Sequence, residues 1–307
     1  MDEVDERPRA ASLPVSLTVD DLLDRYLDGL DADEKLSAKT RFDYRHNAKS
    51  YVRPWLGTKK VRDLTPEVIL AWQRRLLAGG GTKGGKPLSA NTVRLARSPL
   101  TGALKLAVEQ GVIRVNPMTT VARPPTKRKI PKHWSPEQAR QFLDSQNGDR
   151  MYPLRAFLLS SGLRIGELVW LRRDNVDLVR QHARIVEFAS TLGWDLVEPQ
   201  GNSATATRTI DLDSGLVGVL KQQRETQRFE ARWPDYVETG YIFTKPGGGH
   251  YHPETIFKVL GQASADADLP RLTAHGLRHT SATLMLAAGI QPRSPPSASA
   301  TATRRCS

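Results

Sequence analysis

The sequence predicts a mainly α-helical protein that carries a small antiparallel β-sheet and is divided into two domains. Its 307 residues exceed the roughly 100–200 residues of one ordinary domain. Apolar residues recur every three or four positions over most of the chain, which is typical of amphipathic helices. Strand patterns are confined to residues 184–188 and 205–212, where residues alternate or are β-branched. A linker over residues 118–133 contains RPPTKRKIPK, a basic stretch stiffened by proline.

Four short helices are expected before this linker, in a helical domain over residues 15–117. Residues 1–14 are polar, and we expect them to be disordered. Pro99 predicts a kink or a break in the fourth helix, because proline lacks the N–H of the helical ladder. The second helix fits residues 37–51, and the others begin at residues that favour helix starts, namely Thr18, Thr65 with Pro66, and Ser89.

Basic side chains are in excess. The chain has 45 Lys and Arg against 33 Asp and Glu, a formal net charge of +12. This surplus favours a polyanionic partner, since each neutralised phosphate releases condensed counterions. The competing interpretations are an indifferent basic surface and, for the linker, a solvated hinge. The candidate phosphate-binding residues lie on the second and fourth helices and in the linker: Lys39, Arg41, Arg45, Arg94, Arg97, Lys127, Arg128 and Lys129.

Several classes of protein are disfavoured by composition. Cys306 is the only cysteine, so the sequence predicts no disulfide framework and no cysteine-based metal site. His250 and His252 flank Tyr251 in a Gly-rich loop without a cysteine nearby, and we expect no metal site there. No apolar run approaches the roughly 18 residues that span a bilayer, and the acidic start is not a signal peptide. We therefore expect a soluble cytoplasmic protein without a cofactor or a membrane anchor.

The second domain is expected over residues 134–292. Ser135 and Pro136 begin its first helix, and Gly289 stands where its last helix ends. Between these points further helices fit residues 152–160, 215–229, 253–263 and 275–288.

Three segments of this domain carry residues suited to binding a phosphate. Arg164 stands at a helix start, where its planar guanidinium could meet a phosphate while Glu167 holds it. His275 and Arg278 share a helix face at i and i+3. Residues 202–210, NSATATRTI, predict a β-turn that leads into a strand. Singly, the first pair is more often a surface ion pair and the second a helix cap beside an exposed arginine. Together they favour one site.

These motifs resemble the tyrosine recombinase, or phage integrase, family. Residues 161–171, SGLRIGELVWL, are similar to its first arginine box, and residues 272–290, LTAHGLRHTSATLMLAAGI, to its His-x-x-Arg box. Residues 17–117 are similar to its helical core-binding, SAM-like domain and end in GVIRVNP, as is usual there. The resemblance covers residues 15–292. It implies a core-binding domain that binds DNA, followed by an α+β catalytic domain that is incomplete here.

The resemblance also implies the roles of the residues. Arg164 and Arg278 would clamp the scissile phosphate of double-stranded DNA and stabilise charge on its oxygens. His275 would donate a hydrogen bond or transfer a proton, Glu167 would support the arginines, and His279 would pack or orient its helix. The family breaks and rejoins strands through a 3′-phosphotyrosyl intermediate without metal or cofactor. Members of the family work as tetramers on DNA, so the resemblance implies self-association on DNA. It also implies a bacterial or phage-encoded protein that is associated with the nucleoid.

Two catalytic groups of the family are missing at their usual places. Alignment on Arg208 puts Asn202 where the family has a lysine general acid, and asparagine cannot deliver a proton. Lys245, in another turn, is the substitute candidate. The family's nucleophilic tyrosine should follow the His-x-x-Arg box, and so should a Leu-Gly-His box. The seven tyrosines all precede His275, and they are Tyr26, Tyr44, Tyr51, Tyr152, Tyr236, Tyr241 and Tyr251.

Residues 293–307 form an aberrant, low-complexity tail rich in Ser, Pro, Ala, Thr and Arg. Written in GC-rich codons and read from the third base, this tail gives Val-Ala-Ala-Glu-Arg-Leu-Gly-His, which resembles the next segment of the family. We infer a truncation or frameshift after about Pro292, and expect a chain that binds DNA but is catalytically impaired.

The alternative is a non-catalytic DNA-binding regulator or competitor of a full-length integrase. A helix-turn-helix repressor is less favoured, because it needs no phosphate clamp. A metal-dependent nuclease is also less favoured, because it needs a carboxylate cluster.

Overall fold

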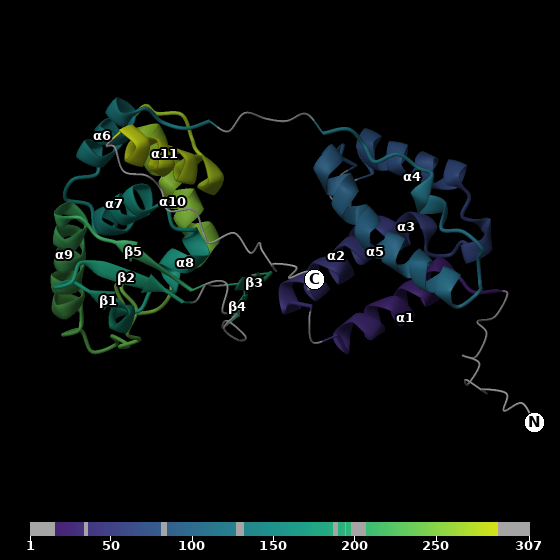
Figure 1. Ribbon diagram of the computed structural model, residues 1–307, viewed down its shortest axis with the longest axis horizontal. Coiled ribbons are helices and arrows are strands. Elements are labelled where there is room, and N and C mark those ends of the chain that lie inside the picture. Colours follow the sequence, from purple (N-terminus) through teal and green to yellow (C-terminus); the bar gives the residue numbers. More distant parts are fainter. Residues whose placement is uncertain are drawn as a thin grey trace, which may run out of the picture. The chain divides into compact units, whose positions relative to one another are not determined.

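The computed structural model describes residues 16–33, 36–80, 85–126, 132–186, 190–193, 195–197 and 207–287. For Ser190, Ala274, His275 and Ala287 it describes the backbone alone. The chain divides into two compact units, Met1–Arg128 and Lys129–Ser307 (Figure 1), and each is considered by itself. The candidate residues Lys127, Arg128, Lys129 and Asn202 lie outside the described residues, as do residues 1–14 and the tail 293–307.

The first unit is helical throughout its described part. The helices are α1 (Val19–Asp31), α2 (Ala38–Asn47), α3 (Arg53–Leu56), α4 (Pro66–Gly79) and α5 (Ala90–Glu109), with a π-helical turn at Ala48–Val52 and 3-10 turns at Val61–Asp63 and Pro117–Thr119. Thr18, Thr65 and Ser89 accept hydrogen bonds from N–H groups of the first turns of α1, α4 and α5, which confirms these three predicted helix starts.

Pro99 does not break α5, contrary to one form of the sequence prediction. A single helix runs through it from Ala90 to Glu109. Pro99 is buried, and Val93, Leu100 and Leu104 along the same helix are fully buried. Packing of this face against α1 and α2 outweighs the loss of one backbone hydrogen bond, and the helix continues.

The second unit combines helices with two small antiparallel sheets, which confirms the predicted fold class. Strands β1 (Val176–Asp177), β2 (His182–Ile185) and β5 (Arg208–Asp211) form one sheet in the order β1-β2-β5, and β3 (Ser190–Leu192) pairs with β4 (Asp195–Val197). The helices are α6 (Pro136–Ser145), α7 (Tyr152–Ser161), α8 (Ile165–Val169), α9 (Ser214–Glu230), α10 (Pro253–Asp266) and α11 (Ala274–Ala287), with a 3-10 turn at Arg173–Asn175.

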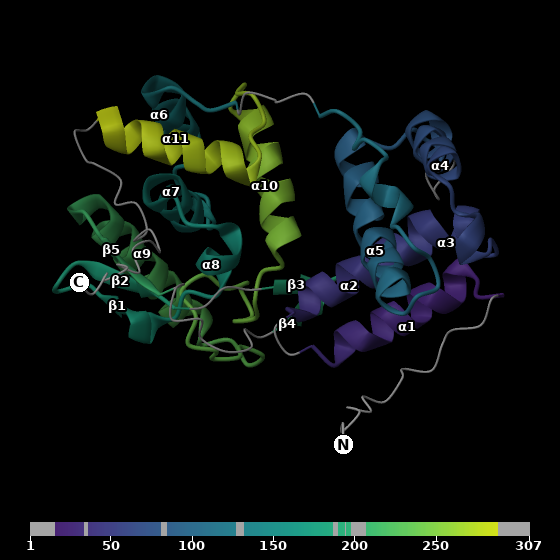
Figure 2. The same ribbon diagram turned by 45° about the vertical axis from the view of Figure 1, so that its right-hand side comes forward.

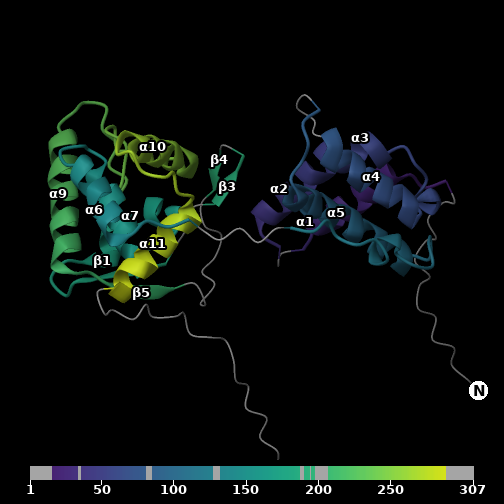
Figure 3. The ribbon, with the colours of Figure 1, turned by 90° about the horizontal axis from the view of Figure 1, so that it is seen from above.

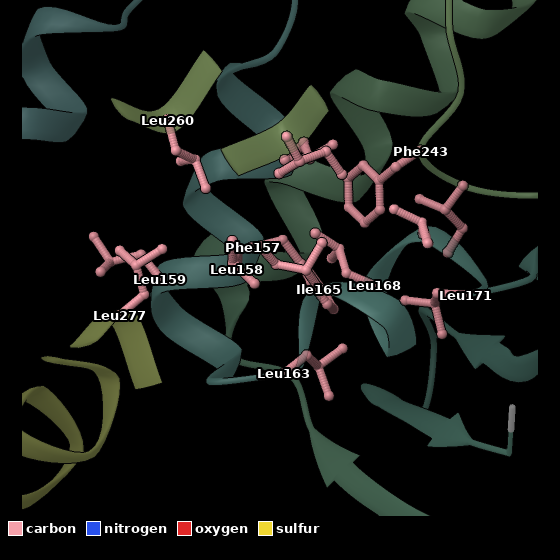
Figure 4. Close-up of a cluster of buried hydrophobic side chains, with 14 of the residues drawn as sticks. Phe157, Leu158, Leu159, Leu163, Ile165, Leu168, Leu171, Phe243, Leu260 and Leu277 are labelled. Atoms are coloured by element: carbon pink, nitrogen blue, oxygen red, sulfur yellow. The ribbon is translucent and has the colours of Figure 1, made fainter. Parts of the chain in front are cut away.

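Helix α7 forms the centre of this unit. It packs against α11 on one side and α9 on the other (Figures 2 and 3). Its Phe157 and Leu159 are almost completely buried and join Leu163 and Leu168 in one core. Leu277 of α11 lies beside Leu159 in that core (Figure 4). The end of α7 and the start of α11 are therefore held together by apolar contacts.

None of the described helices is both long and apolar enough to cross a lipid bilayer.

Candidate functional site

Arg164 follows a tight junction between α7 and α8. Gly162 ends α7 with φ of +61°, a left-handed conformation that favours glycine. A Cβ atom there would lie 2.8 Å from the Oγ atom of Ser281 in α11, so only glycine allows this approach. Two residues later Arg164 is the N-cap of α8, and its side chain is 66% exposed. The junction thus presents an arginine to solvent beside α11.

Glu167 is the point at which two arginines meet. Its Oε2 accepts a hydrogen bond from the Arg164 backbone N–H at 2.8 Å, and its Oε1 accepts one from Arg164 Nη1 at 2.9 Å. Arg208, the first residue of β5, donates from Nη1 to Oε1 and from Nη2 to Oε2, both at 2.8 Å. The predicted pair of Arg164 and Glu167 exists in the structure. The buried carboxylate of Glu167 also binds Arg208 of the sheet.

The charge of Glu167 is stabilised by these contacts. Burial alone raises the pKa of this carboxyl, but the hydrogen bonds from Arg208 and from the Arg164 backbone outweigh burial and lower the pKa to about 2. Glu167 is therefore ionised at neutral pH. In return, its hydrogen bonds raise the pKa of Arg208.

Arg278 joins this group from α11. Its Nη1 atom is buried and, within the described part of the chain, has no hydrogen-bond partner. Burial lowers the pKa of Arg278, and the charges of Arg164 and Arg208 lower it further against the opposing charge of Glu167. A buried guanidinium N–H without an acceptor costs about 1–3 kcal/mol, which a bound anion would offset. The arrangement is therefore suited to an anion.

Two close contacts fix α11 at the site. Trp134 donates its backbone N–H to Thr280 Oγ1 at 3.0 Å, and that hydroxyl donates to the Gly276 carbonyl at 3.0 Å. A Cβ atom on Gly276 would lie 2.6 Å from the Lys132 carbonyl oxygen, so the chain crosses the helix closely there. Arg278 lies two residues from each of them on α11, so these contacts also fix the backbone that carries Arg278.

The other predicted site residues of this unit are His275, His279 and Lys245. His275 is the second residue of α11 and stands three residues before Arg278, but its side chain is outside the described residues. His279 is exposed on α11. Lys245 lies in a turn in which its backbone N–H donates to the Gly249 carbonyl at 2.8 Å, and its proposed role as a substitute acid stays a prediction. The structure brings together Arg164, Glu167 and Arg278 among the predicted residues.

Arg208 is the site residue whose role was missed in the sequence. It served only as a point of alignment, although the alternation of β5 carries a signal. Arg208 pairs with buried Ile185 of β2 and shares its face with Ile210, two residues on. An arginine on the inner face of a strand predicts a buried acidic partner.

Two tyrosines of this unit are engaged elsewhere. The hydroxyl of Tyr251 accepts a hydrogen bond from Arg150 Nη1 at 2.8 Å, and that of Tyr241 accepts one from Arg172 Nη1 at 3.2 Å. Both side chains are buried in the core. Burial raises the pKa of Tyr251, although Arg150 counteracts it. Both hydroxyls are therefore engaged by arginines other than Arg164, Arg208 and Arg278.

The predicted phosphate-binding residues of the first unit differ in their surroundings. Arg45 is exposed and pairs with Asp28 and Asp31. Lys39 pairs with Asp43, and Arg41 donates to the Asp33 carbonyl at 3.2 Å. All three are on α2 and retain partial exposure.

Arg97 does not have the exposure expected of a phosphate-binding residue. It is 5% exposed, and it donates to Gln73 and to the carbonyls of Met118 (3.3 Å) and Val121 (2.9 Å). It stands on the buried face of α5 with Val93 and Leu100, and its guanidinium holds the chain that leaves the unit. Arg94, one turn earlier, donates to Thr126 Oγ1 at 3.1 Å and is partly exposed.

Comparison with known proteins adds independent observations. The model of the phage integrase family matches residues 133–294, and that of the N-terminal SAM-like domain of phage integrases matches residues 18–77. Tyrosine recombinase XerD of Mycobacterium leprae is 28% identical over 289 residues, which cover 88% of this chain and 85% of the relative. A XerC-like tyrosine recombinase of Caldanaerobacter subterraneus is 25% identical over 222 residues, 66% of this chain but only 57% of the relative.

A solved structure shows the same fold. The integrase of transposon Tn1549, in complex with circular intermediate DNA, matches with a TM-score of 0.71 over 90% of this chain and 89% of that one. The two sequences are 21% identical, so this likeness concerns the fold.

Proposed function

This chain belongs to the phage integrase family of tyrosine recombinases, and on that premise we propose that it is a site-specific recombinase or integrase of phage or mobile-element type that binds duplex DNA. The family assignment confirms the resemblance found in the motifs around Arg164 and Arg278. The relatives that it matches are bacterial recombinases, which supports a cytoplasmic, nucleoid-associated protein. Self-association on DNA is part of the same proposal.

One observation carries this proposal at the level of the site. The buried Nη1 of Arg278 has no hydrogen-bond partner in the described structure, and Arg164 and Arg208 contribute positive charge around it. Three guanidinium groups against the single carboxylate of Glu167 leave a local charge of about +2 by simple counting. A phosphodiester offers acceptor oxygens and a negative charge, and it fits the hydrogen-bonding fork of arginine.

In this function Arg164 and Arg278 bind the non-bridging oxygens of the scissile phosphate. Their charges stabilise the negative charge that grows on those oxygens in the transition state, without reorganisation of solvent. His275, three residues from Arg278 on α11, donates a hydrogen bond or transfers a proton. In intact members of the family a tyrosine attacks the phosphorus and forms a 3′-phosphotyrosyl bond.

The finer proposal is that the 307-residue chain binds DNA and does not cleave it. The sequence contains no tyrosine after Tyr251, and Asn202 aligns with the lysine of the family. Tyr241 and Tyr251 are buried and engaged by arginines. The absence of a tyrosine after Tyr251 also favours a second candidate function, in which the chain occupies recombination sites and competes with a full-length integrase.

A covalent-adduct assay tests the finer proposal. The chain is incubated with a pool of random-sequence duplexes, and the products are separated on native and on SDS gels. We expect retarded complexes on the native gel and no SDS-resistant protein–DNA species, because no tyrosine follows the His-x-x-Arg box in this sequence. An adduct whose phosphorylated residue is identified by mass spectrometry would contradict the proposal.

The second candidate is separated from an inactive relic by measurements in cells. Occupancy of recombination sites, together with a change in recombination frequency when the gene is deleted, supports the competitor. Unchanged recombination after deletion contradicts it.

A further inference from the structure

We propose that Arg208 is a positioning residue of the phosphate site, which occupies Glu167 and thereby keeps the guanidinium of Arg164 available for phosphate. This inference rests on the proposed function, because it assigns phosphate as the ligand of Arg164. It concerns a residue outside the arginine and histidine boxes, brought to the site by β5.

The hydrogen bonds around Glu167 show how the carboxylate is shared. A carboxylate has about four acceptor positions. Arg208 takes two of them, one on each oxygen, and the backbone N–H of Arg164 takes a third. Only one position remains for the side chain of Arg164, which fills it through Nη1 at 2.9 Å. Arg164 is therefore held at one corner, and its remaining N–H groups are not drawn to this carboxylate.

Exposure separates the roles of the two arginines. The side chain of Arg164 is 66% exposed, whereas that of Arg208 is 32% exposed and that of Glu167 only 6%. Arg208 therefore lies behind the carboxylate, and Arg164 extends from it toward solvent. A phosphate that approaches from solvent meets Arg164 first.

The sheet makes Arg208 a rigid support. Its backbone lies in the ladder of β5 with β2, opposite Ile185, which is 3% exposed. The fork of Arg208 matches both carboxylate oxygens, which fixes the plane of the carboxylate as well as its position. Because Glu167 and Arg164 are joined by the first turn of α8, the fixed position of the carboxylate also fixes the position of Arg164.

Loss of Arg208 would change the arrangement in a predictable direction. Two acceptor positions on Glu167 would be vacated, and Arg164 could turn to form a bidentate pair with it, which is the favoured geometry for these groups. Arg164 would then be withdrawn from phosphate. The net charge of the site would also fall from about +2 to about +1 when Arg208 is lost. Removal of both Arg208 and Glu167 would return the net charge to about +2.

The test uses the full chain and inorganic phosphate as the probe. Phosphate is titrated against 15N-arginine-labelled protein, and the side-chain Nε–H signals of Arg164 and Arg278 report binding. The variants are R208Q, R208K and the double variant E167Q/R208Q. The matched control is R184Q, since Arg184 is exposed on the opposite face of the sheet, where it pairs with Thr209. Urea unfolding of each variant confirms that it folds.

We expect R208Q to weaken phosphate binding about tenfold, the size of one lost charge-assisted hydrogen bond. R208K retains the charge but lacks the fork, and we expect about threefold weaker binding. The double variant should bind within about threefold of the original chain, because no carboxylate is left to capture Arg164, and R184Q should change binding less than about twofold. The pKa of Glu167, followed by carboxyl NMR, should rise in R208Q.

The outcomes separate the inference from the function on which it rests. R208Q that binds phosphate like the original chain would overturn the positioning role, and so would a double variant as weak as R208Q. R208K equal to the original chain would show that charge alone matters and would also overturn it. An original chain whose Arg164 and Arg278 signals do not respond to phosphate would instead contradict the proposed function.

Discussion

Glu167 makes the stability of the folded chain depend on acid pH. Its pKa is about 2 in the folded state, below the 4.5 of an ordinary glutamate, so the stabilisation is complete above about pH 4.5 and is lost as the pH falls toward 2. A shift of this size corresponds to about 3 kcal/mol. We expect urea unfolding between pH 2.5 and pH 6 to show this loss in the original chain and much less of it in E167Q.

The exposed Glu225, on α9, provides the control for this experiment. E225Q should keep the acid dependence of the original chain. Parallel stability curves for E167Q and the original chain would contradict the assignment of the ionised, doubly paired carboxylate.

Arg278 predicts a conflict between stability and binding. Its Nη1 is buried without a partner in the described structure, and the nearby arginines repel it. Replacement by methionine keeps the apolar stem and removes the unpaired group, so we expect R278M to stabilise the chain by about 1–2 kcal/mol and to weaken DNA binding. Thermal unfolding and fluorescence anisotropy with a labelled duplex measure the two effects. R278M that is destabilised would show that Arg278 has acceptors in the free protein.

Arg97 connects helix α5 to the segment that leaves the first unit. Its guanidinium donates to Met118 and Val121 carbonyls, which an ammonium group cannot reach in the same geometry. We expect R97K to lose about 2 kcal/mol of stability and to be cut faster by trypsin after the exposed Arg114, four residues before Met118. R62K, at an exposed arginine of the 3-10 turn Val61–Asp63, is the control. Equal cleavage rates in R97K and the original chain would refute this anchoring role.

The same helix shows what local sequence patterns can reveal. Val93, Arg97, Leu100 and Leu104 follow one another at spacings of three and four, so Arg97 stands in the apolar stripe. Its charge suggested a surface residue, but its place in the repeat indicated the buried face. The helix starts at Thr18, Thr65 and Ser89 were predictable because capping depends on neighbouring residues alone.

The fold class and the family of the whole chain were predictable from the sequence, because helix periodicity and short motifs are local properties. The pairing of Glu167 with Arg208 was not, since these residues are 41 positions apart and meet only through the sheet. The continuity of α5 through Pro99 likewise depends on packing with other helices. Tertiary contacts of this kind are absent from the local pattern and determine how the arginines of the site are held.

We propose that Arg164 and Arg278 form a phosphate-binding site for duplex DNA, and the salt dependence of DNA binding tests this claim. Affinity for a labelled duplex is measured by anisotropy at several salt concentrations, for the original chain, the double variant R164Q/R278Q and the control R184Q. We expect the original chain and R184Q to share one steep dependence of log affinity on log salt, and the double variant to lose about 1 from its slope per phosphate contact removed. An unchanged slope in the double variant, or no salt-dependent binding by the original chain, would contradict the claim.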